Sequence, residues 1–401
     1  MMKEFARQIA FTIGALLLFR IGTHIPVTGI SASSGPLPPG IVARLSIFSL
    51  GLIPYLTAAI IIQLLSVVWR GLSSLERAGE AGRRKVGRFT LLLTLLFAVF
   101  QAYGIASAIQ RIPGMVADPE GWFVLSATAS MVGGVFFLVW LSEQITRHGV
   151  GNGLALILSV GILTALPSDL AGIVDLVQRG EVSGNLVLAH IIFWLAMVAV
   201  IVLLEKARRN VRVEFAERRA GDRVLPARPA VLPIKINSAG FLIPVTVAPW
   251  IFFLPLSLAG FILGGSHPWL AAAYQHLQLG RPVHLILGAL AVFALAFVYT
   301  AYVVDPEQAA DSLAKQGGSI AGVAPGEATA DHLDRVISLT TVVGAVYLTF
   351  LQLIPEVFVA YGNALPYSMN GGAALIVVCT ILDIQTQVRD VSLTSPGGVR
   401  R

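Results

Sequence analysis

Few residues of this chain have the types and spacing that enzyme chemistry requires. The sequence contains no H-E-x-x-H zinc motif, no pair of cysteines and no G-x-x-x-x-G-K-[ST] phosphate loop. Gly149, Gly151 and Gly153 resemble a fragment of a nucleotide loop, but without a preceding strand we expect a tight turn that enters a helix. His190 stands alone in an apolar stretch, which favours a packing histidine over a ligand. We therefore predict no enzyme activity, no cofactor and no metal site.

Ionisable side chains inside apolar stretches would instead indicate an ion-coupled transporter. Glu143, Glu356 and Asp383 all fall at or near the ends of such stretches, where we expect them to reach headgroups or water. This placement argues against proton or sodium coupling, although a carrier of a neutral solute stays open. Gln63 and Gln101 lie in the middle of apolar stretches. Each side-chain amide needs a hydrogen-bond partner there, because the surrounding hydrocarbon offers none. They indicate either ordinary helix–helix contacts or a polar contact at a seam that opens.

The composition predicts that these residues are held by membrane-spanning helices. The 401 residues are 56% hydrophobic and only 12% charged, whereas soluble domains are about 25% charged. A span needs about 20 apolar residues to cross the hydrocarbon core. Ten stretches qualify, at 8–28, 46–68, 90–111, 122–143, 151–171, 186–205, 238–263, 284–304, 337–355 and 371–388. The stretch at 46–68 is interrupted by Pro54, and the stretch at 238–263 by three prolines.

The positive charges set the predicted orientation. With the N-terminus inside, 23 of the 28 Lys and Arg residues lie in cytoplasmic segments and 4 in outer loops. Positive residues accumulate on the cytoplasmic side, so both termini are predicted to be cytoplasmic. We expect the first stretch to be a span and not a cleaved signal, because it is long and contains Arg20.

Two long cytoplasmic loops, 206–237 and 305–336, are unusual for a transporter. In the first, Val211, Val213 and Phe215 alternate with charged residues, and a Gly-Asp turn signal follows at 221–222. This pattern predicts a basic hairpin. Such a hairpin is either a docking surface for anionic lipid, RNA or an acidic protein face, or a solvated loop that obeys the positive-inside rule.

Several ordered motifs resemble those of one known family. The motifs are Phe19-Arg20-Ile21-Gly22, Ser46-Ile47-Phe48, Gln63-Leu64-Leu65, Gly82-Arg83-Arg84-Lys85, Trp140-Leu141-Ser142-Glu143-Gln144, Gly149-Val150-Gly151-Asn152-Gly153, Leu232-Pro233-Ile234-Lys235, Pro325-Gly326-Glu327 and Leu353-Ile354-Pro355-Glu356. Over about residues 3–390, the chain resembles the SecY family, the channel subunit of the general protein-translocation machinery.

The resemblance implies an all-α polytopic membrane protein with ten transmembrane helices. They would form two pseudo-symmetric halves of five, residues 1–171 and 172–401, around a central pore. The implied pore ring consists of Leu52, Leu56, Leu158, Ile162, Thr246 and Val377. A narrow apolar ring excludes ions by dewetting and deforms around many side chains without binding any tightly. Ordinary helix packing fits the i, i+4 pairs equally well, so only the resemblance favours the ring.

The resemblance also implies a lateral gate through which apolar segments leave for lipid. Gln63, Gln101 and Trp250 would lie near this gate. Pro54 and the prolines of 238–263 would help the second and seventh spans to bend there.

The implied partners are unfolded secretory chains, membrane lipid, small SecE-like and SecG-like subunits, and either a SecA motor or a ribosome, but no DNA. The protein would lie in a bacterial inner membrane. The implied docking residues are Lys206, Arg208, Arg209, Arg212, Ala324, Pro325, Gly326 and Glu327.

One interval and two single residues depart from the family pattern. The interval at 29–45 is short and rich in Pro, Gly and Ser, so the helix that plugs the outer funnel in relatives is expected to be absent or vestigial. Ala324 replaces an arginine that engages the motor, and Thr246 replaces a branched aliphatic. These departures leave open an accessory paralogue that acts as an insertase or serves few clients. A secondary transporter of a neutral solute is the more distant alternative.

Overall fold

The computed structural model describes most of the chain and divides it into two compact units. The described residues are 2–30, 45–116, 122–215, 218–220, 223–225, 228–240, 256, 259–260, 267–278, 280–361 and 371–394. Unit 1 comprises Met1–Gly172 with Ile376–Arg401, and unit 2 comprises Ile173–Leu375. The predicted halves, 1–171 and 172–401, describe an internal symmetry of the chain. A division into compact units does not test symmetry, so the two halves stay a prediction.

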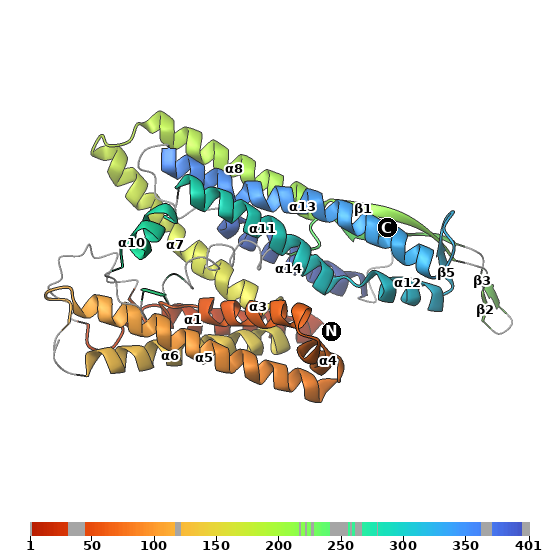
Figure 1. Cartoon of the computed structure of the whole chain (residues 1–401), viewed down its shortest axis with the longest axis horizontal. Helices are drawn as coiled ribbons and strands as arrows, with labels where there is room; N and C mark the ends of the chain where they lie inside the picture. Colours follow the sequence, from red (N-terminus) through yellow and green to blue (C-terminus); the bar gives the residue numbers. More distant parts are fainter. Residues whose placement is uncertain are drawn as a thin grey trace. The chain divides into compact units, whose positions relative to one another are not determined.

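The helices account for most of both units (Figure 1). Unit 1 contains α1 (Met2–Gly22), α3 (Ile53–Val68), α4 (Arg70–Arg77), α5 (Glu80–Gln110), α6 (Phe123–His148) and most of α7 (Gly153–Gln178) and α14 (Gly371–Thr394). Unit 2 contains α8 (Gly184–Lys206), α10 (Pro268–His276), α11 (Pro282–Val303), α12 (Pro306–Lys315) and α13 (Glu327–Tyr361).

Eight helices among the described residues are long and apolar enough to cross a membrane, and Ile53–Val67 is a shorter apolar helix. Nine of the ten predicted stretches overlap these helices; most of the tenth, 238–263, lies outside the described residues. Large aliphatic side chains are exposed along them, for example Leu92 at 66% and Leu203 at 68%. Such surfaces would be unfavourable in water and suit contact with lipid.

Pro54 does not have the predicted role. Helix α3 begins at Ile53, so Pro54 lies in its first turn, and residues 47–52 form turns instead of helix. Proline is tolerated in a first turn because no helical partner is lost there. The predicted bend of this helix at Pro54 is therefore wrong, and the three prolines of 238–263 lie outside the described residues.

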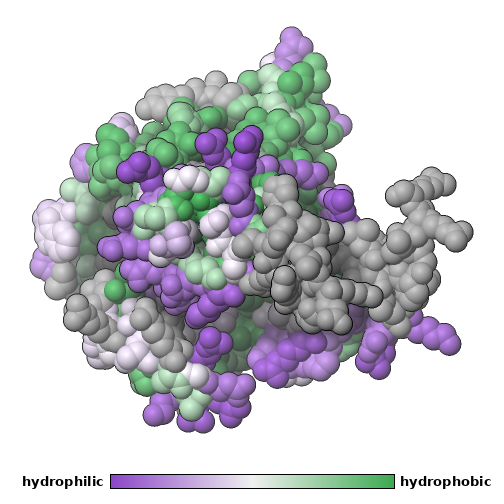
Figure 2. Space-filling model, turned by 90° about the vertical axis from the view of Figure 1, so that its right-hand side faces the viewer, coloured by the Kyte–Doolittle hydropathy of each residue, from purple (hydrophilic) through white to green (hydrophobic). Residues whose placement is uncertain are grey.

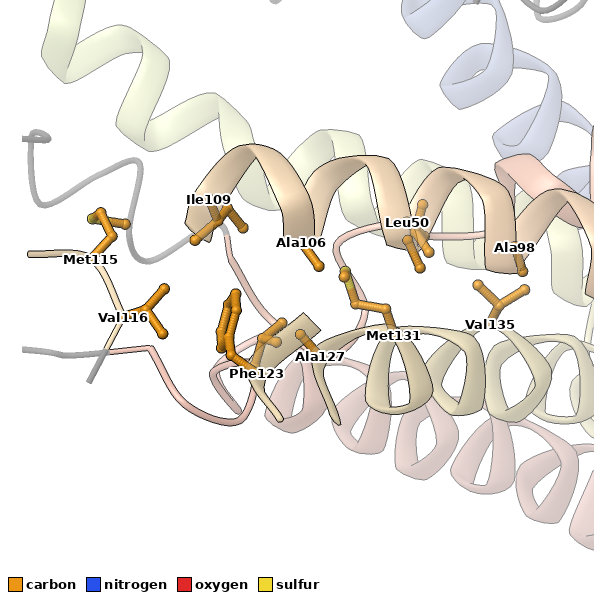
Figure 3. Close-up of a cluster of buried hydrophobic side chains, with 12 residues drawn as sticks. Leu50, Ala98, Ala106, Ile109, Met115, Val116, Phe123, Ala127, Met131 and Val135 are labelled. Carbon is orange, nitrogen blue, oxygen red and sulfur yellow. The ribbon is translucent and has the colours of Figure 1, made fainter. Parts of the chain in front are cut away.

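Small residues allow α5 and α6 to pack closely in unit 1. The buried face of α5 repeats every four residues, and Ala98, Ala102 and Ala106 are fully buried. Figure 3 shows this face turned toward Met131 and Val135 of α6, which belong to the same core cluster. Small side chains at such an interface let two helices approach closely, which favours dispersion contacts in the absence of a hydrophobic driving force.

The predicted hairpin is confirmed. Strands β1 (Arg208–Phe215) and β4 (Arg228–Lys235) pair antiparallel along their full lengths, with Val211 opposite Leu232. A second ladder joins β2 (Arg218–Ala220) to β3 (Arg223–Leu225), and the predicted turn at 221–222 between them lies outside the described residues. Burial follows the predicted alternation, because Val211 and Val213 are buried whereas Arg212 and Glu214 are exposed.

The two predicted long loops form one structural module. Strand β5 (Gly318–Ile320), from the second loop, pairs with β1 and completes a sheet of order β4-β1-β5. One face of the sheet packs on α12 and the start of α13 through a shared core that includes Val213, Leu313 and Leu333. We call β1 to β5, α12 and the first part of α13 the sheet module. Figure 2 faces the end of unit 2 that carries this module, where many hydrophilic side chains lie at the surface.

Candidate functional site

Five of the six predicted ring residues belong to unit 1. Leu52 and Leu56 are one helical turn apart at the start of α3, where the Leu56 backbone N–H donates to the Leu52 carbonyl at 2.9 Å. Both are buried, whereas Leu158 and Ile162 on α7 and Val377 on α14 are half-buried. The sixth, Thr246, lies outside the described residues. The ring itself stays a prediction.

A hydrogen-bonded contact joins the two helices that carry Leu158 and Val377. The Ser159 hydroxyl donates to Thr380 Oγ1 at 2.8 Å, and both side chains are buried. The structure therefore brings α7 and α14 together beside these two predicted ring positions. Sequence reasoning missed this pair, because a single hydroxyl within an apolar span usually bonds to its own helix and gives no distinguishing pattern.

The glycines before α7 form the predicted turn. Gly151 has a φ of 84°, which favours glycine, and the Asn152 side chain accepts from the Leu154 N–H at 3.0 Å as an N-cap. A Cβ at Gly153 would lie 1.9 Å from the Ser142 carbonyl oxygen, so α7 starts in direct contact with α6. The turn fixes where α7 begins and hence the positions of Leu158 and Ile162 along the axis of this helix.

The described gate residues lie on helices that pack against each other. Gln63 is on α3 and Gln101 is on α5. Within the described residues, the buried Oε1 of Gln63 and the buried Nε2 of Gln101 have no hydrogen-bond partner. An unsatisfied buried amide destabilises its surroundings, which is compatible with a seam that rearranges. Trp250 lies outside the described residues, so the gate stays a prediction.

An apolar groove of about 910 Å³ runs between α3, α4 and α5. Its walls include Leu65 and Trp69 on one side and Phe89, Leu92 and Leu96 of α5 on the other. Because its lining is almost entirely hydrocarbon, the groove suits acyl chains or apolar peptide segments and offers nothing to a polar solute.

The predicted ionisable groups behave differently from one another. Glu143 is exposed and forms an ion pair with Arg147, and Asp383 is exposed, as expected for residues near span ends. The expectation for Glu356 is wrong, because its side chain is 2% exposed. Its Oε1 contacts Nδ1 of the buried His284 and accepts the Gly280 N–H at 2.8 Å. Partners from α11 and the preceding loop thus replace water around this carboxylate.

The predicted docking residues lie on the sheet module or at its start. Lys206 ends α8, and Arg208, Arg209 and Arg212 follow on β1, all exposed. The second group is the exposed loop from Ala324 to Glu327, in which Gly326 has a φ of 96°. The Thr329 hydroxyl holds this loop by donating to the Ala324 carbonyl at 2.8 Å. Val323, beside the loop, packs on the same core as Val211 and Val213 of β1, so both groups belong to one compact body.

The described part of the chain is therefore a polytopic α-helical membrane protein that carries a basic sheet module. Residues 46–385 match the family model for SecY. The chain is 38% identical to the protein translocase subunit SecY of Escherichia coli K12, covering 98% of this chain and 93% of the relative. It is 36% identical to the same subunit of Vibrio cholerae, covering 97% and 92%. The chain belongs to the SecY family.

Solved channel structures share the fold. One, described in a study of the SecY plug domain and the membrane seal, matches with a TM-score of 0.72 at 20% identity, covering 99% of this chain and 95% of that one. Another, canine Sec61 in a ribosome–channel complex, matches with a TM-score of 0.64 at 20% identity, again covering 99% and 95%. The architecture is thus that of the SecY and Sec61 channels.

Proposed function

We propose that this protein is the channel subunit of a Sec-type translocase, which passes unfolded secretory chains across the membrane and releases apolar segments sideways into lipid. The observation that carries the proposal is the similarity to SecY translocase subunits along nearly the whole chain. The described ring positions support it, because all five are aliphatic and none is fully exposed. Such a constriction resists ions by dewetting yet yields to a passing chain.

The channel itself would supply no covalent chemistry. The energy would come from a SecA motor, a translating ribosome or the proton-motive force. Small SecE-like and SecG-like subunits would accompany it in a bacterial inner membrane. The positive charge distribution supports cytoplasmic termini and a cytoplasmic sheet module.

Site-specific crosslinking tests the channel. A photoreactive residue at Leu158 or Val377 is expected to form adducts with a secretory chain stalled in translocation. The matched control is Leu163 on the same α7 helix, which follows Ile162 directly and is 44% exposed. Adducts at the control but at neither ring position would contradict a pore here. Uptake of a neutral solute by proteoliposomes that lack any partner would favour a transporter instead.

The resting seal gives a further expectation. The interval at 29–45, most of which lies outside the described residues, has no helical periodicity in its sequence. If the plug helix is absent, the apolar ring alone holds back ions, and the resting conductance should exceed that of a plugged relative. Conductance of the purified protein in a planar bilayer measures this, and a leak as small as that of a plugged channel argues against it.

The basic strand is the proposed docking face for the ribosome or motor. Replacing Arg208, Arg209 and Arg212 by Gln removes three exposed charges while the ladder and the module core remain. We expect weaker binding of ribosomes or SecA and a shallower dependence of binding on salt. The control replaces three exposed arginines of the predicted outer loops, Arg111, Arg179 and Arg281. Equal loss of binding in both variants would show that only net charge matters.

A second candidate is an accessory paralogue that acts as an insertase or serves few clients. The exposed Ala324 favours it, because alanine cannot supply the planar five-donor fork of the arginine usual in the family. If weak motor coupling at this loop limits the protein, Ala324→Arg should raise SecA-driven translocation. If Ala324→Arg did not raise translocation, weak motor coupling at this loop would not be what limits the protein.

A further inference from the structure

We propose that Ser159 and Thr380 are positioning residues that set the spacing of α7 and α14 and thereby the width of the constriction at Leu158 and Val377. The proposal rests on the proposed channel function. Neither hydroxyl belongs to the predicted ring, gate or docking surface. The pair follows Leu158 by one residue on α7 and Val377 by three residues on α14.

The hydrogen bonds form a short chain that satisfies both hydroxyl protons. Ser159 donates to Thr380 Oγ1 at 2.8 Å, and Thr380 donates to the carbonyl of Ile376 in its own helix at 2.7 Å. The Ala155 carbonyl lies 3.3 Å from the Thr380 oxygen, and the Ile376 carbonyl lies 3.4 Å from the Ser159 oxygen. The two helices therefore meet through polar atoms on both sides, and neither side chain is more than 4% exposed.

A second contact joins the turn that precedes α7 to α14. The Gly151 N–H donates to Gln387 Oε1 at 2.9 Å, at an exposed position. A Cβ added at Gly151 would lie 3.4 Å from the Ile384 side chain, so this turn and α14 are also in close contact there. The contacts of Gly151 with Gln387 and of Ser159 with Thr380 define an antiparallel seam. The hydroxyl pair is the one beside the predicted ring.

The chemistry of the pair suits a seam that separates and closes again. If the helices part, Thr380 retains the bond to its own helix, and Ser159 can turn to a carbonyl of α7 as serine commonly does. No buried charge or permanently unsatisfied proton is left behind. The pair therefore fixes one spacing at rest without preventing a wider one, as a constriction that admits a chain requires.

The experiment removes the bond while leaving the shape of the helices nearly unchanged. Ser159→Ala with Thr380→Val deletes both hydroxyls. The control, Thr164→Val with Thr386→Val, deletes one hydroxyl from each of the same helices. Within the described residues these hydroxyls donate to carbonyls of their own helices, at 3.1 and 2.7 Å. In planar bilayers we expect a several-fold rise in resting conductance for the first variant and wild-type conductance for the control. Equal conductance in both variants would overturn the proposal.

A distance measurement separates this proposal from the channel function. Spin labels on cysteines replacing the exposed Leu163 and Ile381 report the spacing of α7 and α14, in a background where Cys379 is changed to Ala. We expect a longer or broader distance distribution when the hydroxyl pair is removed and not in the control. If the protein conducted neither ions nor peptide, the channel function would fail, yet a changed distribution would still support the positioning role. An unchanged distribution would overturn it.

Discussion

The two units hold their helices together with different buried polar contacts. In unit 1, two neutral hydroxyls join α7 to α14, namely Ser159 and Thr380. In unit 2, an ionisable pair joins α11 to α13, namely His284 and Glu356, with the Gly280 N–H as a third partner. All four side chains are buried, so solvent cannot replace either contact at its native spacing.

The difference lies in what remains when each contact breaks. A hydroxyl can bond to a carbonyl of its own helix, and Thr380 already does so. A buried carboxylate has no such local alternative, and leaving it without partners is costly. The unit 1 seam is therefore suited to opening, whereas the unit 2 seam is suited to remaining closed. This contrast agrees with the placement of two predicted ring residues beside the unit 1 seam.

The largest effect is expected at the ionisable pair. Glu356→Ala leaves His284 and the Gly280 N–H without their buried acceptor, and breaking a buried pair in this way typically costs about 3–5 kcal/mol. We expect a marked fall in the midpoint of thermal unfolding of the purified protein. The control is Glu143→Ala, which breaks an exposed ion pair worth about 0–1 kcal/mol. Similar losses in the two variants would remove the contrast between the seams.

An apolar contact on the same α13 helix sharpens the comparison. Leu333 is fully buried in the core of the sheet module, near the opposite end of α13 from Glu356. Leu333→Ala should cost about 2–5 kcal/mol through lost contacts and a cavity. Because that core supports β1, we expect faster proteolysis of the hairpin, which Val231→Ala at an exposed position should not cause. If Leu333→Ala leaves the hairpin protected, the sheet does not depend on α13 for its stability.

Local patterns predicted the elements well. The apolar stretches locate nine helices, and the alternation of Val211 and Val213 with charged residues identifies the strand β1 and its buried face. A proline within an apolar stretch fits either a bend or a first turn, so the sequence predicts a bend at Pro54 where the structure has a first turn. Only backbone geometry separates the two readings.

Contacts between distant residues could not be predicted in the same way. Strand β5 contains only three residues, Gly318 to Ile320, and becomes a strand because β1 offers it an edge. Glu356 looked like a residue at a span end because its partner His284 is 72 positions away. Ser159 and Thr380 are 221 positions apart, and nothing in either neighbourhood indicates the other. The predicted ring is implied by family resemblance alone, whereas the contact beside it is visible only in the folded structure.

The smallest effect is expected at the hydroxyl pair, and its size decides whether the unit 1 seam is suited to opening. Hydrogen bonds between membrane helices contribute about 0.6 kcal/mol on average in double-mutant cycles. A cycle of Ser159→Ala, Thr380→Val and the double variant, followed by reversible unfolding in detergent, should give a coupling energy of about that size. A coupling energy as large as the unfolding free energy lost in Glu356→Ala would mean that the hydroxyls lock the seam. Such a strong bond would oppose the separation of α7 and α14 that a passing chain requires. A small coupling combined with a measurable rise in resting conductance would mean that the pair sets the resting spacing and then yields.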